Sequence, residues 1–288
     1  MVARGTPQEG LEPVFASIGE VLDDPRAKRV HTIGVSVPGW VDPGRGIVLR
    51  AANIPCWRNF PLARKIRRRF QLPVRTGNDG NLAALAEATW GAGRGYASLL
   101  YVTVGTGVGT GIVIDGRLYS GRAGGAVEGG HLPINFRGPR CGCGKRGCAE
   151  AYFSGTAIAR RARRLAATPA GRKSKLFDLA GGKIRAVTAE TVARAAAEDD
   201  PLAARILDEA AGYFAIWLGG MIDLLEPGVI IIGGGMGRLM LSLRSRLRRG
   251  LEAWAANPRR EEIPLVAARY GADSALVGAA ALGLADNE

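Results

Sequence analysis

The sequence of 288 residues has little of what would place it in a specialised class of protein. It has two histidines and four cysteines, too few for a disulfide scaffold, and only 6% aromatic residues. No apolar run approaches the roughly 20 residues of a membrane span, and the first ten residues lack the apolar core of a secretion signal. Repeats, low-complexity tracts and polar linkers are also missing. These absences predict a soluble, globular, cytoplasmic protein.

The charge is one-sided, with 39 lysines and arginines against 26 acidic residues, a formal net charge of +13. Only six of the basic residues are lysines, and the arginines gather along predicted helices, for example at 64–70, 160–164 and 244–249. These stretches lack the interleaved aromatic side chains that stack on nucleic acid bases. The pattern favours a solvated surface over a nucleic acid interface, and arginine clusters could also serve a phosphate-bearing substrate.

Hydrophobic periodicity predicts an α/β protein. Short β-rich runs are predicted as strands at 30–37, 99–104, 111–114, 229–232 and 265–268. Helical patterns occupy 62–70, 81–90, 149–166, 188–198, 201–225, 238–254 and 274–284. Asp200 followed by Pro201 is a typical N-cap and first-turn pair. Residues 121–148 show neither period and are rich in glycine, which predicts a compact irregular loop.

Four residues of metal-binding type crowd into this loop: His131, Cys141, Cys143 and Cys148. One imidazole and three thiols within 18 positions form a Cys₃His set suited to tetrahedral Zn²⁺. Four protein ligands leave no position for an activated water, so the predicted zinc is structural. The alternatives are a cluster of free thiols or disulfides, and a cytosolic protein disfavours disulfides. Cys56 stands apart and is predicted to be a small core residue.

Two carboxylates lie close to these ligands in the sequence. Glu128 precedes His131 by three positions, and Glu150 follows Cys148 by two. A metal that folds the loop would draw both acids together, and such acceptors bind neutral polyhydroxylated ligands. The alternative is that both are exposed surface glutamates.

The segment Gly-Asn-Asp-Gly-Asn at 77–81 allows two interpretations. Asn78 and Asp79 are common helix caps, and a turn followed by an N-cap is the simpler interpretation. The alternative places Asp79 at a substrate hydroxyl, where a carboxylate can act as a general base.

Two glycine-dense turns are candidates for phosphate binding. Gly105–Gly111 joins two predicted strands, and Gly233–Gly235 joins a predicted strand to a helix. Exposed backbone N–H groups in such turns can surround phosphate oxygens, although tight turns need glycine in any case. Neither is a Walker loop, because no Gly-Lys-Ser/Thr follows, and neither opens a dinucleotide-binding unit.

Taken together, these motifs resemble the ROK family of sugar kinases and sugar-responsive repressors. Residues 104–118 resemble its second phosphate motif, and Glu128-Gly-Gly-His131 with the segment 141–150, Cys-Gly-Cys-Gly-Lys-Arg-Gly-Cys-Ala-Glu, resembles its sugar and zinc signature. The remaining matches are the catalytic segment at 77–87, sugar-side loops at 34–39 and 53–59, and the adenosine strand and turn at 227–235. The resemblance implies an α/β, actin-like and hexokinase-like (ribonuclease H-like) fold of two lobes.

The resemblance also implies a reaction, the ATP-dependent phosphorylation of a hexose 6-hydroxyl, as in glucokinases. Asp79 would be the general base. The sugar hydroxyls would be held by Asn78, Asp79, Glu128, His131 and Glu150. The nucleotide would be bound by Gly105, Thr106, Gly107, Gly109, Gly234 and Gly235. Structural zinc, Mg²⁺ with ATP and a homodimer are the implied cofactors and assembly.

The N-terminus departs from the family pattern. The family's kinases begin with a strand that carries Asp-x-Gly-Gly-Thr, the first phosphate loop, and no such segment stands in this sequence. We therefore expect a truncated N-terminal lobe formed by 1–80 and 272–288, next to a large lobe formed by 81–271. Either the start lies upstream or part of the phosphate clamp is lacking. The alternative functions are the effector-binding portion of a repressor, which alone would involve nucleic acid, and a non-catalytic sugar-binding protein.

Overall fold

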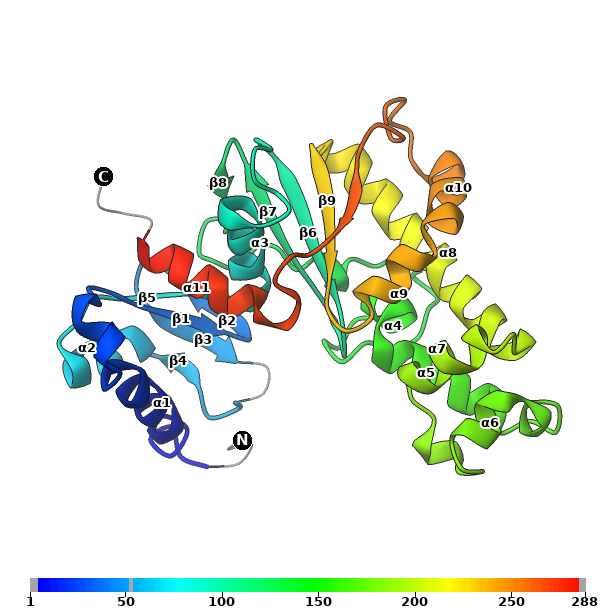
Figure 1. Ribbon diagram of the computed structural model, residues 1–288, viewed down its shortest axis with the longest axis horizontal. Helices are drawn as coiled ribbons and strands as arrows, with labels where there is room; N and C mark the ends of the chain where they lie inside the picture. Colours follow the sequence, from blue (N-terminus) through cyan, green and yellow to red (C-terminus); the bar gives the residue numbers. More distant parts are fainter. Residues whose placement is uncertain (1–4, 52–53, 285–288) are drawn as a thin grey trace. The chain divides into compact units, whose positions relative to one another are not determined.

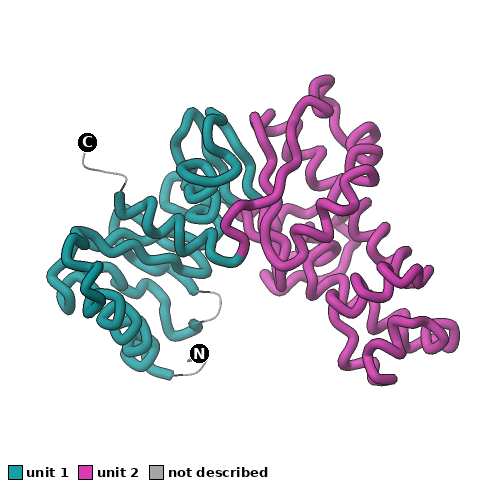
Figure 2. The backbone as a smooth tube through the Cα atoms, in the orientation of Figure 1, with its two compact units in different colours: residues 1–101, 111–127, 272–288 teal, residues 102–110, 128–271 magenta. Residues whose placement is uncertain are grey.

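The computed structural model describes residues 5–51 and 54–284 (Figure 1). The chain divides into two compact units (Figure 2). Unit 1 comprises residues 1–101, 111–127 and 272–288, and unit 2 comprises 102–110 and 128–271. The predicted lobes differ from these units in the assignment of 81–101 and 111–127, and the division into lobes stays a prediction.

Unit 1 contains two small sheets with helices packed on them. β1 (Ile33–Val37) and β5 (Val74–Asn78) pair in parallel, with Ile33 opposite Val74 and Val37 opposite Asn78. An antiparallel sheet has the order β2 (Gly39–Asp42), β3 (Ile47–Ala51), β4 (Arg58–Phe60). The helices α1 (Glu12–Leu22) and α2 (Leu62–Phe70) share one buried cluster with these strands.

The sequence predicted part of this unit. The helix at 62–70 is confirmed, and so is a strand within 30–37. Because β1 extends over residues 34–37, most of the predicted sugar-side loop at 34–39 is strand instead. Residue 53 of the second such loop lies outside the described residues. The helix α1 and strands β2 to β5 were not predicted. The four strands are only three to five residues long, too short to show a clear period.

Helix α2 is held by two buried side chains and carries an excess of charge. Leu62 and Ile66 are fully buried one turn apart, and burial of such a side chain contributes about 1.5–3 kcal/mol. Five of the nine residues are basic, and four of them form like-charged pairs four positions apart, Arg64 with Arg68 and Lys65 with Arg69. Each such pair costs about 0.2–0.5 kcal/mol. The helix therefore depends on packing rather than on its surface.

Two alanine-rich helices far apart in the sequence pack closely in unit 1. They are α3 (Asp79–Trp90) and α11 (Ser274–Leu284) (Figure 1). A Cβ at Gly278 would collide with the carbonyl oxygen of Leu82, so the contact between the helix backbones requires glycine. Both helices were predicted, with α3 expected to begin two residues later, at Asn81.

A five-stranded sheet has the order β10-β9-β6-β7-β8. Its strands are β6 (Leu99–Val104), β7 (Val108–Ile114), β8 (Arg117–Leu118), β9 (Val229–Gly233) and β10 (Leu265–Ala267). All of β9 is buried, as expected from its unbroken apolar run. Strand β7 begins three residues earlier than predicted, so the turn after β6 is short and Gly109 lies within a strand.

The helices of unit 2 follow the predicted pattern with two breaks and one addition, α6, which was not predicted. They are α4 (Glu150–Phe153), α5 (Gly155–Ala166), α6 (Lys175–Leu179), α7 (Ala189–Ala197), α8 (Pro201–Leu225), α9 (Gly237–Ser242) and α10 (Arg244–Trp254). The helix predicted over 149–166 is divided at Ser154, whose side chain caps α5. The helix predicted over 238–254 is divided at Leu243. Asp200 caps α8 through the Ala203 N–H, as predicted.

Within the described part of the chain, no helix combines the length and the apolar character that crossing a membrane requires. The 25 residues of α8 include Arg205, Asp208, Glu209 and Asp223.

The contact at Gly278 yields a stability prediction. Gly278→Ala should lower the free energy of unfolding by about 1–3 kcal/mol, because the added methyl group must push α11 away from α3. Urea denaturation measures this. Gly283→Ala is the matched control on the same helix, since its Cβ would make only ordinary van der Waals contacts, the nearest with Thr32 Cγ2 at 3.7 Å. Equal stability of the two variants would contradict the close packing.

Candidate active site and metal centre

The loop predicted at 121–148 is irregular in the structure and brings four ligand atoms together. Apart from a single 3₁₀ turn at Gly129–His131, the loop forms only isolated bridges, between Pro133 and Cys148 and between Arg140 and Arg146. The imidazole of His131 and the thiols of the three loop cysteines lie within 4.8 Å of one another. The predicted set of ligands therefore converges from a segment with almost no regular backbone structure.

The spacing of these atoms fits a tetrahedral zinc ion. With Zn–S near 2.3 Å and Zn–N near 2.0–2.1 Å, a tetrahedron needs S···S of about 3.8 Å and S···N of about 3.6 Å. The Sγ atoms of Cys143 and Cys148 are 3.7 Å apart, and Cys141 Sγ lies 3.6 Å from His131 Nδ1. The donor chemistry and the geometry agree, so these residues would hold Zn²⁺ through Nδ1 and three sulfur atoms.

The same cluster is costly without a metal. Burial raises the pKa of the Cys141 thiol to about 12, so its ligand form is strongly disfavoured in the empty site. Binding of zinc would remove the thiol proton and give the buried sulfur atoms of Cys141 and Cys148 a metal bond each. Cys56 lies apart, half-buried against the core of unit 1, as predicted.

Glu150 connects the metal loop to the first glycine turn. Its Oε1 lies 3.5 Å from Cys141 Sγ, and its Oε2 accepts a 3.0 Å hydrogen bond from the N–H of Val108. A Cβ at Gly107 would lie 2.5 Å from Oε2, so this approach of carboxylate and turn requires glycine there. Glu150 is thus a bridging carboxylate rather than the exposed surface glutamate of the alternative interpretation.

The segment from Glu128 to His131 is fixed by two buried side chains. The N–H of Gly129 donates to Thr110 Oγ1, and the carbonyl oxygen of Gly129 accepts from Trp217 Nε1, both at 2.9 Å. Glu128 Oε2 then lies 4.0 Å from His131 Nε2, on the side of the ring away from the metal-facing Nδ1. Sequence reasoning missed both residues. Thr110 lies within the motif at 104–118, but its side chain was not singled out, and Trp217 is 88 positions from its partner.

The two glycine turns meet at the ends of β6 and β9. The carbonyl oxygen of Val104 accepts from Met236 N–H at 2.9 Å, and that of Gly105 accepts from Gly155 N–H at 2.8 Å. These bonds bring both turns and the N-terminus of α5 together. A Cβ at Gly105 or Gly235 would meet no atom within 4 Å, so both backbones border open space. Backbone N–H groups at such a junction suit an anion.

In unit 1, Asn78 and Asp79 stand where β5 passes into α3. Asn78 is the N-cap, since its Oδ1 accepts from Asn81 N–H at 3.1 Å, and its Nδ2 donates to the carbonyl oxygen of Gly39 at 2.9 Å. Asp79 is therefore not needed as the cap. Desolvation by the surrounding protein raises the pKa of the Asp79 carboxyl group, while hydrogen bonds from Gly80 and Asn78 lower it by less. Solvent still reaches the side chain. A raised pKa with solvent access suits a general base.

Each unit thus carries its own chemical groups. Unit 2 brings together the metal ligands, Glu128, Glu150 and both glycine turns, including Gly105, Gly107, Gly234 and Gly235. Thr106 is exposed in the first turn, and Gly109 lies in β7. Unit 1 carries Asn78 and Asp79. These features define an α/β protein with a Cys₃His centre beside a pair of glycine turns.

Comparisons with known proteins agree with this description. A model of the ROK family matches residues 2–286. The chain is 34% identical over 276 residues to a glucokinase of Thermotoga maritima, which covers 96% of this chain and 86% of that protein. A structure of a ROK family glucokinase from Streptomyces griseus, in complex with glucose and AMPPNP, has a TM-score of 0.83 at 34% identity and covers 99% of this chain and 90% of that one.

A second solved structure is a ROK family transcriptional regulator, a homolog of the E. coli MLC protein. Its TM-score is 0.82 at 28% identity, and it covers 96% of this chain and 69% of that chain. The chain belongs to the ROK family. Its mixed α/β fold is the predicted one.

The metal centre yields a prediction about zinc. The purified protein should contain one Zn²⁺ per chain, and Cys148→Ser should lose it and show a lower Tm, because a buried ligand is removed. Metal analysis and thermal unfolding measure both effects. In the variant without zinc, trypsin should cut the loop at Arg140, Lys145 or Arg146, because the loop is no longer held in place by the metal. Cys56→Ser is the matched control, and loss of zinc from that variant too would refute the assignment.

Proposed function

We propose that this protein is an ATP-dependent sugar kinase with glucose as its preferred hexose. The observation that carries the proposal is Asp79, a solvent-accessible carboxyl group with a raised pKa that the helix does not need as its cap. The kinase relatives support the assignment.

In the proposed reaction, Asp79 takes the proton of the sugar 6-hydroxyl while that oxygen attacks the γ-phosphate of ATP. Phosphoryl transfer needs positioning and charge neutralisation more than covalent help, so one aligned carboxylate suffices. Asn78, Glu128, His131 and Glu150 hold the other sugar hydroxyls. Mg²⁺, bound with ATP, neutralises charge on the phosphates.

The nucleotide is assigned to the two glycine turns. Gly105, Thr106, Gly107 and Gly109 would face the phosphates, and Gly234 and Gly235 the nucleoside. The open space beside Gly105 and Gly235 supports this, because it leaves room for a ligand to approach the backbone of both turns. Glu150 holds the Val108 N–H in place, so one carboxylate serves the sugar and the shape of the phosphate turn together.

The second candidate is the effector-binding portion of a sugar-responsive regulator, which the similarity to the ROK family transcriptional regulator favours. Both functions need sugar binding, and only the kinase needs turnover. The two functions are therefore distinguished by measuring turnover and sugar binding on the same preparation.

The assay is sugar-dependent formation of ADP from ATP, with glucose, fructose, N-acetylglucosamine and xylose compared. Glucose should give the highest kcat/KM. Thermal unfolding is followed in parallel, because a bound sugar raises Tm whether or not it reacts. A sugar that raises Tm without turnover would replace the kinase with the regulator or with a non-catalytic sugar-binding protein.

The base yields a second prediction. Asp79→Asn should lower kcat by about 10²–10⁴-fold, because the amide cannot accept the hydroxyl proton. Tm should change little, since relief of carboxylate desolvation opposes the lost interaction with the positive end of α3. Asp23→Asn, at an exposed helix end, is the matched control and should keep full activity.

The pH dependence follows from the same group. The base works only when it is deprotonated, and its pKa lies above the ordinary value of 3.8. The kcat/KM of the native protein should therefore fall on acidification at a higher pH than an ordinary aspartate would give. The residual activity of Asp79→Asn should lack that acidic limb. An unchanged limb in the variant would assign it to another group.

A further inference from the structure

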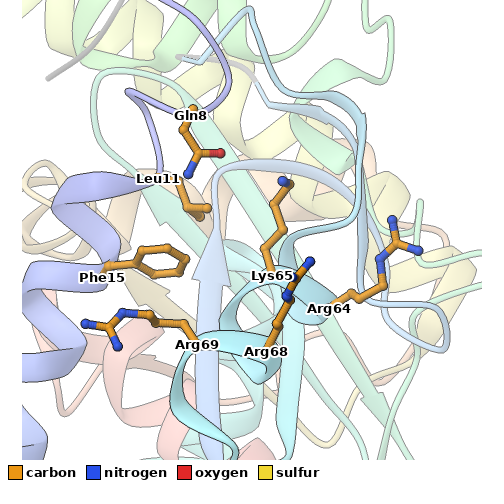
Figure 3. Close-up of a pocket in the computed structure, with 7 residues that line it drawn as sticks. All are labelled: Gln8, Leu11, Phe15, Arg64, Lys65, Arg68 and Arg69. Atoms are coloured by element: carbon orange, nitrogen blue, oxygen red, sulfur yellow. The ribbon is translucent and has the colours of Figure 1, made fainter.

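A hollow of about 640 Å³ in unit 1 is lined by residues of α2, of α1 and of the segment before α1, and none of the residues assigned above lines it (Figure 3). Four of its lining residues are cations of α2: Arg64, Lys65, Arg68 and Arg69. The others are Gln8, Leu11 and Phe15, and no carboxylate lines it. We call this hollow the α1–α2 groove. In Figure 3 the side chains of Phe15 and Arg69 extend from the two helices toward the space between them.

The floor of the groove is apolar. The ring of Phe15 packs edge-on against Phe70, with 5.7 Å between ring centroids, and Leu11 is fully buried. A second hollow adjoins along α2 and shares Arg64 and Arg68 with the groove. Two of the cations therefore border both hollows.

The cations of the groove are not neutralised by the described part of the protein. Within residues 5–51 and 54–284, none of the four forms an ion pair. The ammonium group of Lys65 and the guanidinium group of Arg69 lie over the rings of Phe60 and Phe70, contacts that leave their charge in place. The groove is thus a concave surface with uncompensated positive charge.

Helix electrostatics explain only part of this charge. Arg67, Arg68 and Arg69 lie in the last turn of α2, where cations interact favourably with the helix dipole. Arg64 and Lys65 lie in the first half of α2, near the positive end of its dipole, where a cation is not stabilised by that dipole. Each also stands four positions before another cation. An arrangement that opposes local stability at several positions is typical of a functional surface.

We propose that the α1–α2 groove binds a chain of contiguous phosphate groups, carried by a nucleotide or by an inorganic oligophosphate. The volume is that of a small-molecule site. Arginine offers paired N–H donors that match phosphate oxygens, and several cations on one hollow match several linked phosphates. Leu11 and Phe15 give the floor on which the apolar part of a nucleotide can rest. This site goes beyond the proposed kinase reaction.

The test uses the full chain and inorganic tripolyphosphate as the probe, with binding measured by calorimetry at low and moderate salt. Arg64→Gln/Arg68→Gln should weaken binding about tenfold or more and reduce its salt dependence, because two phosphate contacts are lost. Arg244→Gln/Arg249→Gln removes the same charge from exposed positions of α10 and is the matched control. It should bind as the native protein does.

Two further probes distinguish the sources of phosphate. If the Arg64→Gln/Arg68→Gln variant also binds ADP more weakly than the native protein does, and the native protein binds ADP more tightly than AMP, the ligand is a nucleotide. If only tripolyphosphate responds, the ligand is an inorganic oligophosphate. Glutamine keeps the helix propensity of arginine, and both positions are exposed, so the groove variant should retain its Tm and its sugar-dependent turnover.

Three results would overturn the proposal. The native protein could fail to bind any of these probes. The two double variants could lose affinity equally, which would show that only net charge matters. Duplex DNA could compete for the groove with an affinity that grows with its length beyond the hollow, which would make α2 part of a nucleic acid surface instead.

Discussion

The segment from His131 to Cys148 has almost no regular backbone structure, so its position depends on four metal ligands and a few hydrogen bonds to its neighbours. Glu150 follows the last ligand and begins α4, where its carboxylate reaches both Cys141 and the N–H of Val108. The cluster of metal-ligand residues, the carboxylate of Glu150 and the first glycine turn therefore form one connected unit. The side chain of Glu150 links Cys141 to the first glycine turn, so a movement of Cys141 would be passed to that turn through Glu150.

The same unit illustrates how buried polar groups specify a site. Thr110 and Trp217 use their only strong hydrogen-bonding atoms on the backbone of Gly129, inside a region that excludes water. A buried donor or acceptor without a partner is costly, so these bonds favour one position of the Glu128–His131 segment over its alternatives. The Glu128–His131 segment is thus held by two residues that supply none of the four clustered ligand atoms.

Much of the fold could be predicted from local pattern. The helices at 62–70, 201–225 and 274–284 agree with the structure at both ends, because each combines a clear period with a distinct start. The prediction failed where elements are short, as in β2 to β4. It also failed where periodicity continues through a break, as at Ser154, whose extended backbone and capping hydroxyl end one helix and begin the next.

The sequence by itself determined which residues can supply metal ligands, which carboxylates lie beside them and where glycine permits close backbone approach. Residue chemistry and spacing carry that information, and resemblance to the ROK family gave the motifs a function. Only the tertiary structure decided that Glu150 joins the cysteine loop to the first glycine turn and that Thr110 and Trp217 fix the Glu128–His131 segment. It also decided that the cations of α2 line a hollow. Those contacts join residues from 19 to 88 positions apart or two different helices, and no local pattern encodes which distant groups will meet.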